Sequence, residues 1–198
     1  MELYNLITAG REGRNLEYKQ SMSWNDPSTK ANITRAILAM SNIRDGGAIV
    51  LGVEERSDGT FEPIGMNPAD ADTFDYDEVA SYVAEYADPY VQFSLDRVEY
   101  EGKIFIVIQV KEFEEVPVIC KKSGKNLCRG KIYTRTRRMP ESAEVSSQSE
   151  MREIIDMAVE KGIRRLLQLF SRIGLTPPTP ASAPIDDELF NKQIEELL

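Results

Sequence analysis

Carboxylates and a lysine near the N-terminus, and two more carboxylates after an apolar run, are the residues of this chain best suited to chemistry. Glu12, Glu17 and Lys19 lie close together in sequence, and Glu54 and Glu55 follow the apolar run. Carboxylate oxygens are the ligands that Mg2+ and Mn2+ prefer, and a nearby lysine suits phosphate. If the two strand ends adjoin, Glu12, Glu17 and Glu54 or Glu55 would hold a metal ion that activates water, with Lys19 beside them. The alternative is that these acids sit in solvent or brace the fold.

A basic segment near the C-terminal end of the predicted domain indicates a polyanion partner. The net charge is −9, yet no acid occurs between Cys120 and Pro140. Along a strand Lys131, Tyr133 and Arg135 would share one face, with an aromatic ring between two cations. Such an edge suits a nucleic-acid backbone with a stacked base. The alternatives are a solvated basic loop and an edge strand that avoids aggregation. The predicted nucleic-acid contacts are Lys121, Lys122, Lys125, Arg129, Lys131, Tyr133, Arg135, Arg137 and Arg138.

The composition excludes several classes of site. The chain has no histidine, which rules out Ser-His-Asp and Cys-His catalysis and His-ligated zinc. Two cysteines, Cys120 and Cys128, are too few for a disulfide framework and fit no common zinc spacing. No apolar run approaches the ~20 residues that span a bilayer. We therefore expect a cytoplasmic protein with reduced thiols and no membrane partner.

The hydrophobic periodicity predicts an α/β (α+β) fold with a mixed sheet and packed helices. Gly46-Gly47 stops one helix before a buried strand, and Asn42 could brace that turn through its amide. Asp58-Gly59 predicts a tight hairpin turn. The expected helices cover residues 1–9, 27–40, 75–86 and 151–173, and the expected strands cover residues 16–19, 48–53, 93–100, 104–110 and 132–135.

The composition divides the chain into a domain and a C-terminal helical extension. The domain spans residues 1–141, and residues 142–174 contain a long amphipathic helix. A Pro-rich linker covers 175–185 and a short terminal helix 186–198. We expect the long helix and the tail to help assemble a homodimer.

In order and spacing, four segments resemble the Schlafen AlbA-type (AlbA_2) domain family, over about residues 11–140. They are Glu12 to Lys19, then Ala39-Met40-Ser41-Asn42 with Gly46-Gly47, then Val50-Leu51-Gly52-Val53-Glu54-Glu55, and the closing strand Gly130-Lys131-Ile132-Tyr133-Thr134-Arg135. The resemblance implies a Schlafen AlbA-like fold that binds nucleic acid. In nuclease-active relatives it also implies a metal-dependent endoribonuclease that acts on structured RNA such as tRNA, so RNA is favoured over DNA. By position the acids would be Glu12, Glu17 and Glu54 or Glu55, although the third acid of the family is usually Asp.

The sequence is also compatible with two other functions. The first is a non-catalytic DNA-binding or RNA-binding regulatory module whose carboxylates are structural. The second is a nucleotide (ATP)-binding module with Gly46-Gly47 near phosphate. No Gly-Lys-Ser/Thr follows this glycine pair, so it is not a P-loop.

Overall fold

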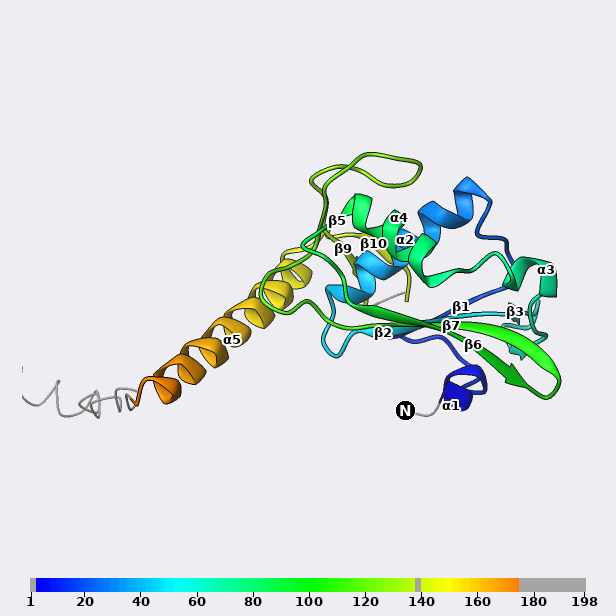
Figure 1. Ribbon diagram of the computed structural model, residues 1–198, viewed down its shortest axis with the longest axis horizontal. Coiled ribbons are helices and arrows are strands. Elements are labelled where there is room, and N and C mark those ends of the chain that lie inside the picture. The colour runs from blue at the N-terminus through cyan, green and yellow to red at the C-terminus, as the bar shows by residue number, and fades with distance from the viewer. Residues whose placement is uncertain (1–2, 138–139, 175–198) are drawn as a thin grey trace, which may run out of the picture. The chain divides into compact units, whose positions relative to one another are not determined.

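The computed structural model describes residues 3–137 and 140–174. Figure 1 shows the helices and strands along the chain. In order they are α1 (Leu3–Ile7), β1 (Leu16–Lys19), α2 (Pro27–Ser41), β2 (Gly47–Leu51), β3 (Val53–Glu55), β4 (Phe61–Pro63), α3 (Pro68–Ala71), α4 (Tyr76–Tyr86), β5 (Ala87–Asp88), β6 (Phe93–Tyr100), β7 (Lys103–Val110), β8 (Ile119–Cys120), β9 (Tyr133–Arg135), β10 (Ser142–Glu144) and α5 (Gln148–Arg172).

A four-stranded mixed sheet in the order β1-β2-β7-β6 forms the centre of the fold. Strand β1 runs parallel to β2, while the pairs β2–β7 and β7–β6 are antiparallel. The parallel pair requires a crossover, and α2 supplies it. Three two-stranded ladders, β3–β4, β5–β8 and β9–β10, complete the strands of the described residues. The predicted mixed sheet with packed helices is confirmed.

Two hydrophobic clusters cover the two faces of the central sheet. Helices α2 and α4 lie on one face and the short α1 on the other (Figure 1). Side chains alternate along β2, so Ile49 faces the α2 side and Val50 the α1 side, and both are fully buried. Both faces of β2 are therefore covered, as its continuous apolar run predicted.

The turn between α2 and β2 depends on its glycines. Gly46 has φ of +67°, and a Cβ there would lie 2.0 Å from the carbonyl oxygen of Val110. A Cβ on Gly47 would lie 2.1 Å from the sulfur of Met40. The fully buried Asn42 donates to the carbonyls of Leu38, Val118 and Tyr133 and accepts from the Val118 amide at 2.9 Å. The structural roles predicted for these residues are confirmed.

The chain divides into two compact units, residues 1–161 and 162–198. Helix α5 begins in the first unit, where Ile154 and Met157 are buried in the core. Of the second unit the structure describes residues 162–174, the rest of this helix and the Gly174 turn. The predicted Pro-rich linker and terminal helix lie outside the described residues. No described helix is both long and apolar enough to cross a membrane.

Candidate functional site

Glu17 lies inside β1, flanked by two residues whose side chains face the α1 side of the sheet. Its own side chain therefore points toward the α2 side, and the residue is only 6% exposed. Three side chains hold its carboxylate: Arg135 at 2.7 Å, Lys19 at 2.6 Å and the Ser142 hydroxyl at 3.2 Å. Two cations thus neutralise this carboxylate within the fold.

Arg135 is a buried structural residue. It is 1% exposed and, besides Glu17, donates to the backbone carbonyls of Arg14 at 3.2 Å and Gly13 at 3.1 Å. Arg14 returns a bond from its Nε to the Arg135 carbonyl at 2.9 Å and pairs with Glu153 of α5. Burial lowers the pKa of Arg135, and its acidic neighbours oppose that shift. The two arginines connect the N-terminal loop, β9 and α5.

Glu12 lies beside Glu17 and Arg135, but in a different environment. One oxygen accepts the Tyr18 backbone N–H at 2.6 Å. Burial raises the pKa of Glu12, and the Tyr18 hydrogen bond and Lys19 only partly counter that shift. A carboxyl whose charged form is disfavoured by burial can hold or release a proton at a site.

Glu12, Glu17 and Lys19 line one cavity of about 280 Å³. Its formal charges balance, with three carboxylates opposite three cations. The lining residues are Glu12, Glu17, Lys19, Asn32, Arg35, Arg135, Pro140, Glu141 and Ser142. Such a balanced site can orient a small polar group or a phosphate. A metal ion there would have to compete with Arg135 and Lys19 for Glu17.

Glu54 and Glu55 are not gathered with the first two acids. Strand β2 ends beside Lys19, and Gly52, with φ of +106°, then turns the chain into the β3–β4 hairpin. There Arg56 pairs with Glu54 at 2.7 Å, and neither acid lines the cavity. Within residues 3–137 and 140–174, no group of three or more His, Cys, Asp or Glu residues is placed to hold a metal ion.

The expectation that Tyr133 and Arg135 form an exposed basic edge is wrong. Tyr133 is 2% exposed, packs in the core and accepts the Cys128 amide on its hydroxyl at 2.9 Å. Its ring is therefore unavailable for stacking on a base. Thr134 between them is also fully buried, because α2 covers one side of β9 and β10 pairs with its edge.

The remaining basic residues lie on the surface, and several are paired. Lys122 contacts Glu85, Lys131 contacts Glu144 at 2.9 Å, and Arg137 contacts Glu153 at 3.3 Å. Arg138 lies outside the described residues. The three exposed cations Lys121, Lys125 and Arg129 form no ion pair with another described residue. We call these three the loop cations.

Helix α2 adds surface groups that the sequence did not single out. Lys125 contacts the Ser28 hydroxyl and Asn126 contacts Asn32, so the 120–132 loop meets the N-terminal half of α2. Lys30 stands over the ring of Trp24 at 5.5 Å. No sequence signal marks these contacts, because the paired residues lie 97 and 94 positions apart in the chain.

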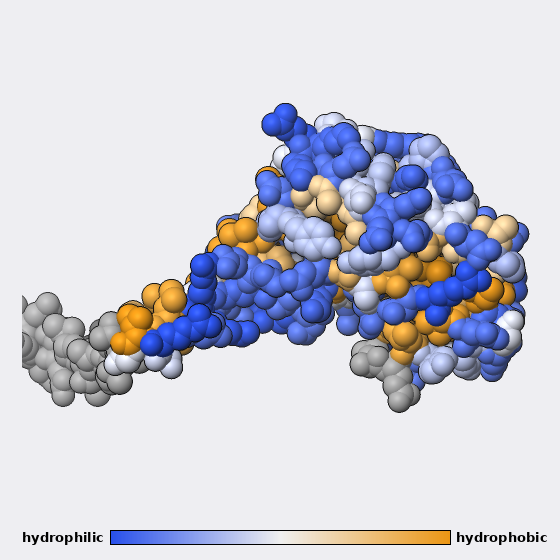
Figure 2. Space-filling model, viewed as in Figure 1, coloured by the Kyte–Doolittle hydropathy of each residue, from blue (hydrophilic) through white to orange (hydrophobic). Residues whose placement is uncertain are grey.

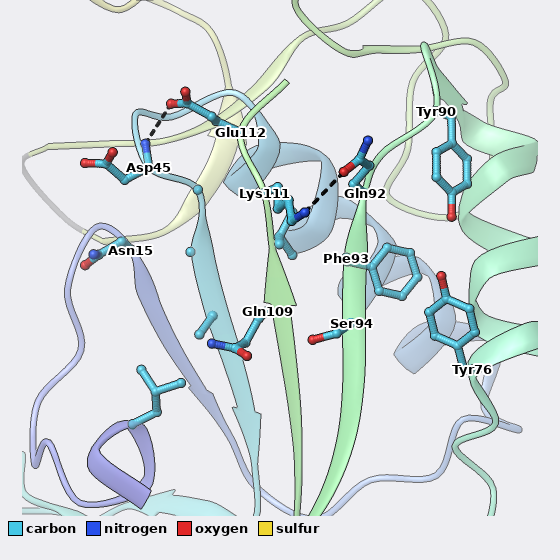
Figure 3. A pocket seen from close by; sticks show the side chains of 15 residues that line it. Asn15, Asp45, Tyr76, Tyr90, Gln92, Phe93, Ser94, Gln109, Lys111 and Glu112 are labelled. Atoms are coloured by element: carbon cyan, nitrogen blue, oxygen red, sulfur yellow. Dashed lines mark hydrogen bonds between the residues drawn. The ribbon is translucent and has the colours of Figure 1, made fainter. Parts of the chain in front are cut away.

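A larger hollow of about 990 Å³ lies beside Gly46-Gly47 (Figure 3). Asp45 donates its backbone N–H to the Glu112 carboxylate at 2.8 Å, and Lys111 contacts Gln92 at 3.4 Å. Two acids and one lysine make this rim unfavourable for phosphate. The glycine pair therefore does not support the ATP-binding alternative.

Comparison with known proteins identifies the family. A family model described as "Schlafen, AlbA_2" matches residues 12–144, more than half of the chain. No curated protein matches. Among solved structures, the DIP2311 protein of Corynebacterium diphtheriae aligns with a TM-score of 0.49 at 15% identity, covering 77% of this chain. This chain spans only 27% of that protein. The N-terminal domain of a putative ATP-dependent DNA helicase RecG-related protein from Nitrosomonas europaea aligns with a TM-score of 0.46 at 23% identity, covering 72% of this chain and 92% of that one. The chain belongs to the Schlafen AlbA_2 family.

Proposed function

We propose that this chain binds nucleic acid, preferably RNA, through the 120–132 loop and the adjoining N-terminal half of α2. The loop cations carry the proposal, since they are exposed and form no ion pair with another described residue, in a chain with net charge −9. Phosphates attract such cations and release counterions when they bind, so a small basic surface suffices for a salt-dependent interaction. Membership of the AlbA_2 family supports the same function.

The first test measures binding across a range of salt concentrations. Fluorescence anisotropy with a labelled structured RNA and a DNA duplex of equal length would compare wild type with Lys121→Ala/Lys125→Ala/Arg129→Ala. Loss of three phosphate contacts should lower the slope of log K against log salt by about 2 to 3. Weaker binding of the DNA would support the RNA preference.

The matched control removes three cations elsewhere, in Arg11→Ala/Lys103→Ala/Lys111→Ala. This triple change alters the net charge equally, and all three residues are exposed. It should leave the salt slope nearly unchanged. Equal losses in both triple variants would reject the loop as the binding surface.

A metal-dependent endoribonuclease is the second candidate function. Its support is the placement of Glu12 and Glu17 in one cavity with Lys19. Mg2+ or Mn2+ would be held by these two acids, with water or substrate oxygens completing its shell. Because Arg135 and Lys19 already neutralise Glu17, the geometry supports the non-catalytic binding module better.

Cleavage of a labelled tRNA pool with Mn2+ separates these two functions. A nuclease should lose cutting in Glu12→Gln while RNA binding survives, and it should keep cutting in Glu54→Gln. Wild-type protein that binds RNA but does not cut it would identify the binding module.

The proposal also includes a homodimer and a cytoplasmic location. The exposed apolar side chains of α5 support the dimer. Cys120 and Cys128 are both free thiols, which suits a reducing compartment. Light scattering at micromolar concentration tests the dimer, and a monomer would contradict it.

A further inference from the structure

Helix α5 carries a second apolar face besides the one that packs on its domain. Five exposed apolar residues and one glycine recur along the helix at alternating intervals of four and three, which is the heptad spacing of a coiled coil. The five apolar residues are 47–65% exposed. The helix positions in this series, which we call the seam, are Ile155, Val159, Gly162, Leu166, Leu169 and Ile173.

The seam lies on a different side of the helix from the packed face. At ~100° per residue, Ile154 and Met157, which are buried, lie more than ~90° from the middle of the seam. The seam is therefore not an extension of the domain core. Hydrophobic surface along this helix is visible in Figure 2.

We propose that two copies of this chain pair through the seam with their α5 helices antiparallel. The inference rests on the proposed homodimer and specifies its interface and orientation. An antiparallel pair about a two-fold axis is self-complementary, because each copy offers the same surface.

The seam positions match an antiparallel partner layer by layer. With the axis near residue 164, Ile155 meets the partner's Ile173, and Val159 meets the partner's Leu169. Gly162 meets the partner's Leu166, so the smallest seam residue faces a large one. In a parallel pair Gly162 would instead meet the partner's Gly162 and leave a gap in the core.

The charges along α5 favour the same orientation. The first half carries four acids, Glu150, Glu153, Asp156 and Glu160, with one arginine. The second half, residues 161–173, carries four cations and no acid. An antiparallel pair places the acidic half of each helix beside the basic half of its partner, whereas a parallel pair places like charges together.

The chain's own C-terminal segment is the rival occupant of the seam. The seam spans about 27 Å at 1.5 Å per residue, whereas the 13 residues predicted as the terminal helix would span about 20 Å. A second copy of α5 matches the whole seam. We therefore favour the second copy and make the tail an outcome of the test.

Light scattering of the full chain tests the interface. Leu166→Glu places a charge in the seam and should weaken dimerisation by at least about 100-fold, because the charge would be buried between helices. Leu167→Glu is the matched control, since Leu167 is 45% exposed beside 49% for Leu166 but lies outside the seam. The control should remain a dimer. A dimer that survives Leu166→Glu but is lost on truncation after Gly174 would assign assembly to the tail and overturn the inference.

Cysteine cross-linking tests the orientation. In a Cys128→Ser background, oxidising a mixture of Val159→Cys and Leu169→Cys chains should give a mixed disulfide dimer. Leu169→Cys alone should not cross-link, because the two copies of residue 169 lie about 15 Å apart along an antiparallel pair. Cross-linking of Leu169→Cys alone would show a parallel pair, while a monomeric wild type would reject the proposed homodimer itself. Neither result would affect the separately measured binding of nucleic acid.

Discussion

Replacing Arg135 by methionine tests whether the Glu17–Arg135 pair is a structural brace. The side chain of Arg135 is 1% exposed and that of Glu17 is 8% exposed, and their charged atoms are 2.7 Å apart. Removing one partner of a buried pair costs about 3–5 kcal/mol, because the remaining charge stays buried without compensation. Lys19 remains 2.6 Å from Glu17, so we expect a value near the lower end of this range, about 3 kcal/mol. Typical domains have only about 5–15 kcal/mol in total.

Urea unfolding followed by far-UV circular dichroism measures this loss. The double variant Glu17→Gln/Arg135→Met removes both charges and should lose less than the sum of the two single variants. The coupling free energy of the cycle should be about 1–3 kcal/mol. A smaller value would mean that the two residues act independently.

Arg137→Met is the control for this measurement. Arg137 is two residues further along, is 74% exposed and pairs with Glu153 at 3.3 Å. Arg137 is largely exposed and Glu153 keeps its second partner Arg14, so the loss should change stability by less than about 1 kcal/mol. If Arg135→Met and Arg137→Met cost the same, Arg135 is not a buried brace in solution and the reasoning fails.

Three further predictions concern the cavity and the turn after α2. Because burial raises the pKa of Glu12, the protonated carboxyl favours the folded state, and this stabilisation is lost as pH rises through the folded pKa. Glu12→Gln should therefore stabilise the protein at neutral pH in urea titrations, and the gain in stability should disappear below about pH 4. Gly46→Ala and Gly102→Ala both place a Cβ at φ near +70°, but of these two glycines only Gly46 has close neighbours. Thermal unfolding should show that Gly102→Ala loses about 1 kcal/mol of stability and Gly46→Ala at least about 3 kcal/mol. Equal losses would contradict the close approach at Gly46. Asn42→Ala leaves buried backbone groups unpaired and should lower stability by about 3 kcal/mol or more. Asn32→Ala removes only an exposed contact and should lower it by less than about 1 kcal/mol. Similar chemical-denaturation midpoints for the two variants would refute the bracing role of Asn42.

The sequence predicted most of the helices and strands because their signals are local. Helix α2 begins at Pro27, as expected for the helix over 27–40, and Asp26 caps it by accepting the Ser28 amide at 2.9 Å. The Asp58-Gly59 turn joins β3 to β4 for the same reason. The short pairs β5–β8 and β9–β10 were not fully foreseen, since two-residue and three-residue strands carry no periodicity.

The sequence also determined the family and the two acids that share a cavity. Glu12 and Glu17 lie near each other along the chain, so a short segment suffices to bring them together. The expectation that Glu54 or Glu55 joins these two acids was wrong, because it assumed that the acids follow directly on two adjoining strand ends. Strands β1 and β2 do adjoin, but Gly52 turns the chain before those acids are reached.

Only the tertiary structure decided the role of Arg135. In sequence it is one cation in a basic segment, and alternation alone placed it on an exposed edge. In the fold α2 packs on β9 and β10 pairs with it, and Arg135, which is 1% exposed, meets Glu17, 118 residues earlier. Periodicity identifies which residues share a face, but whether another element covers that face depends on contacts between distant segments.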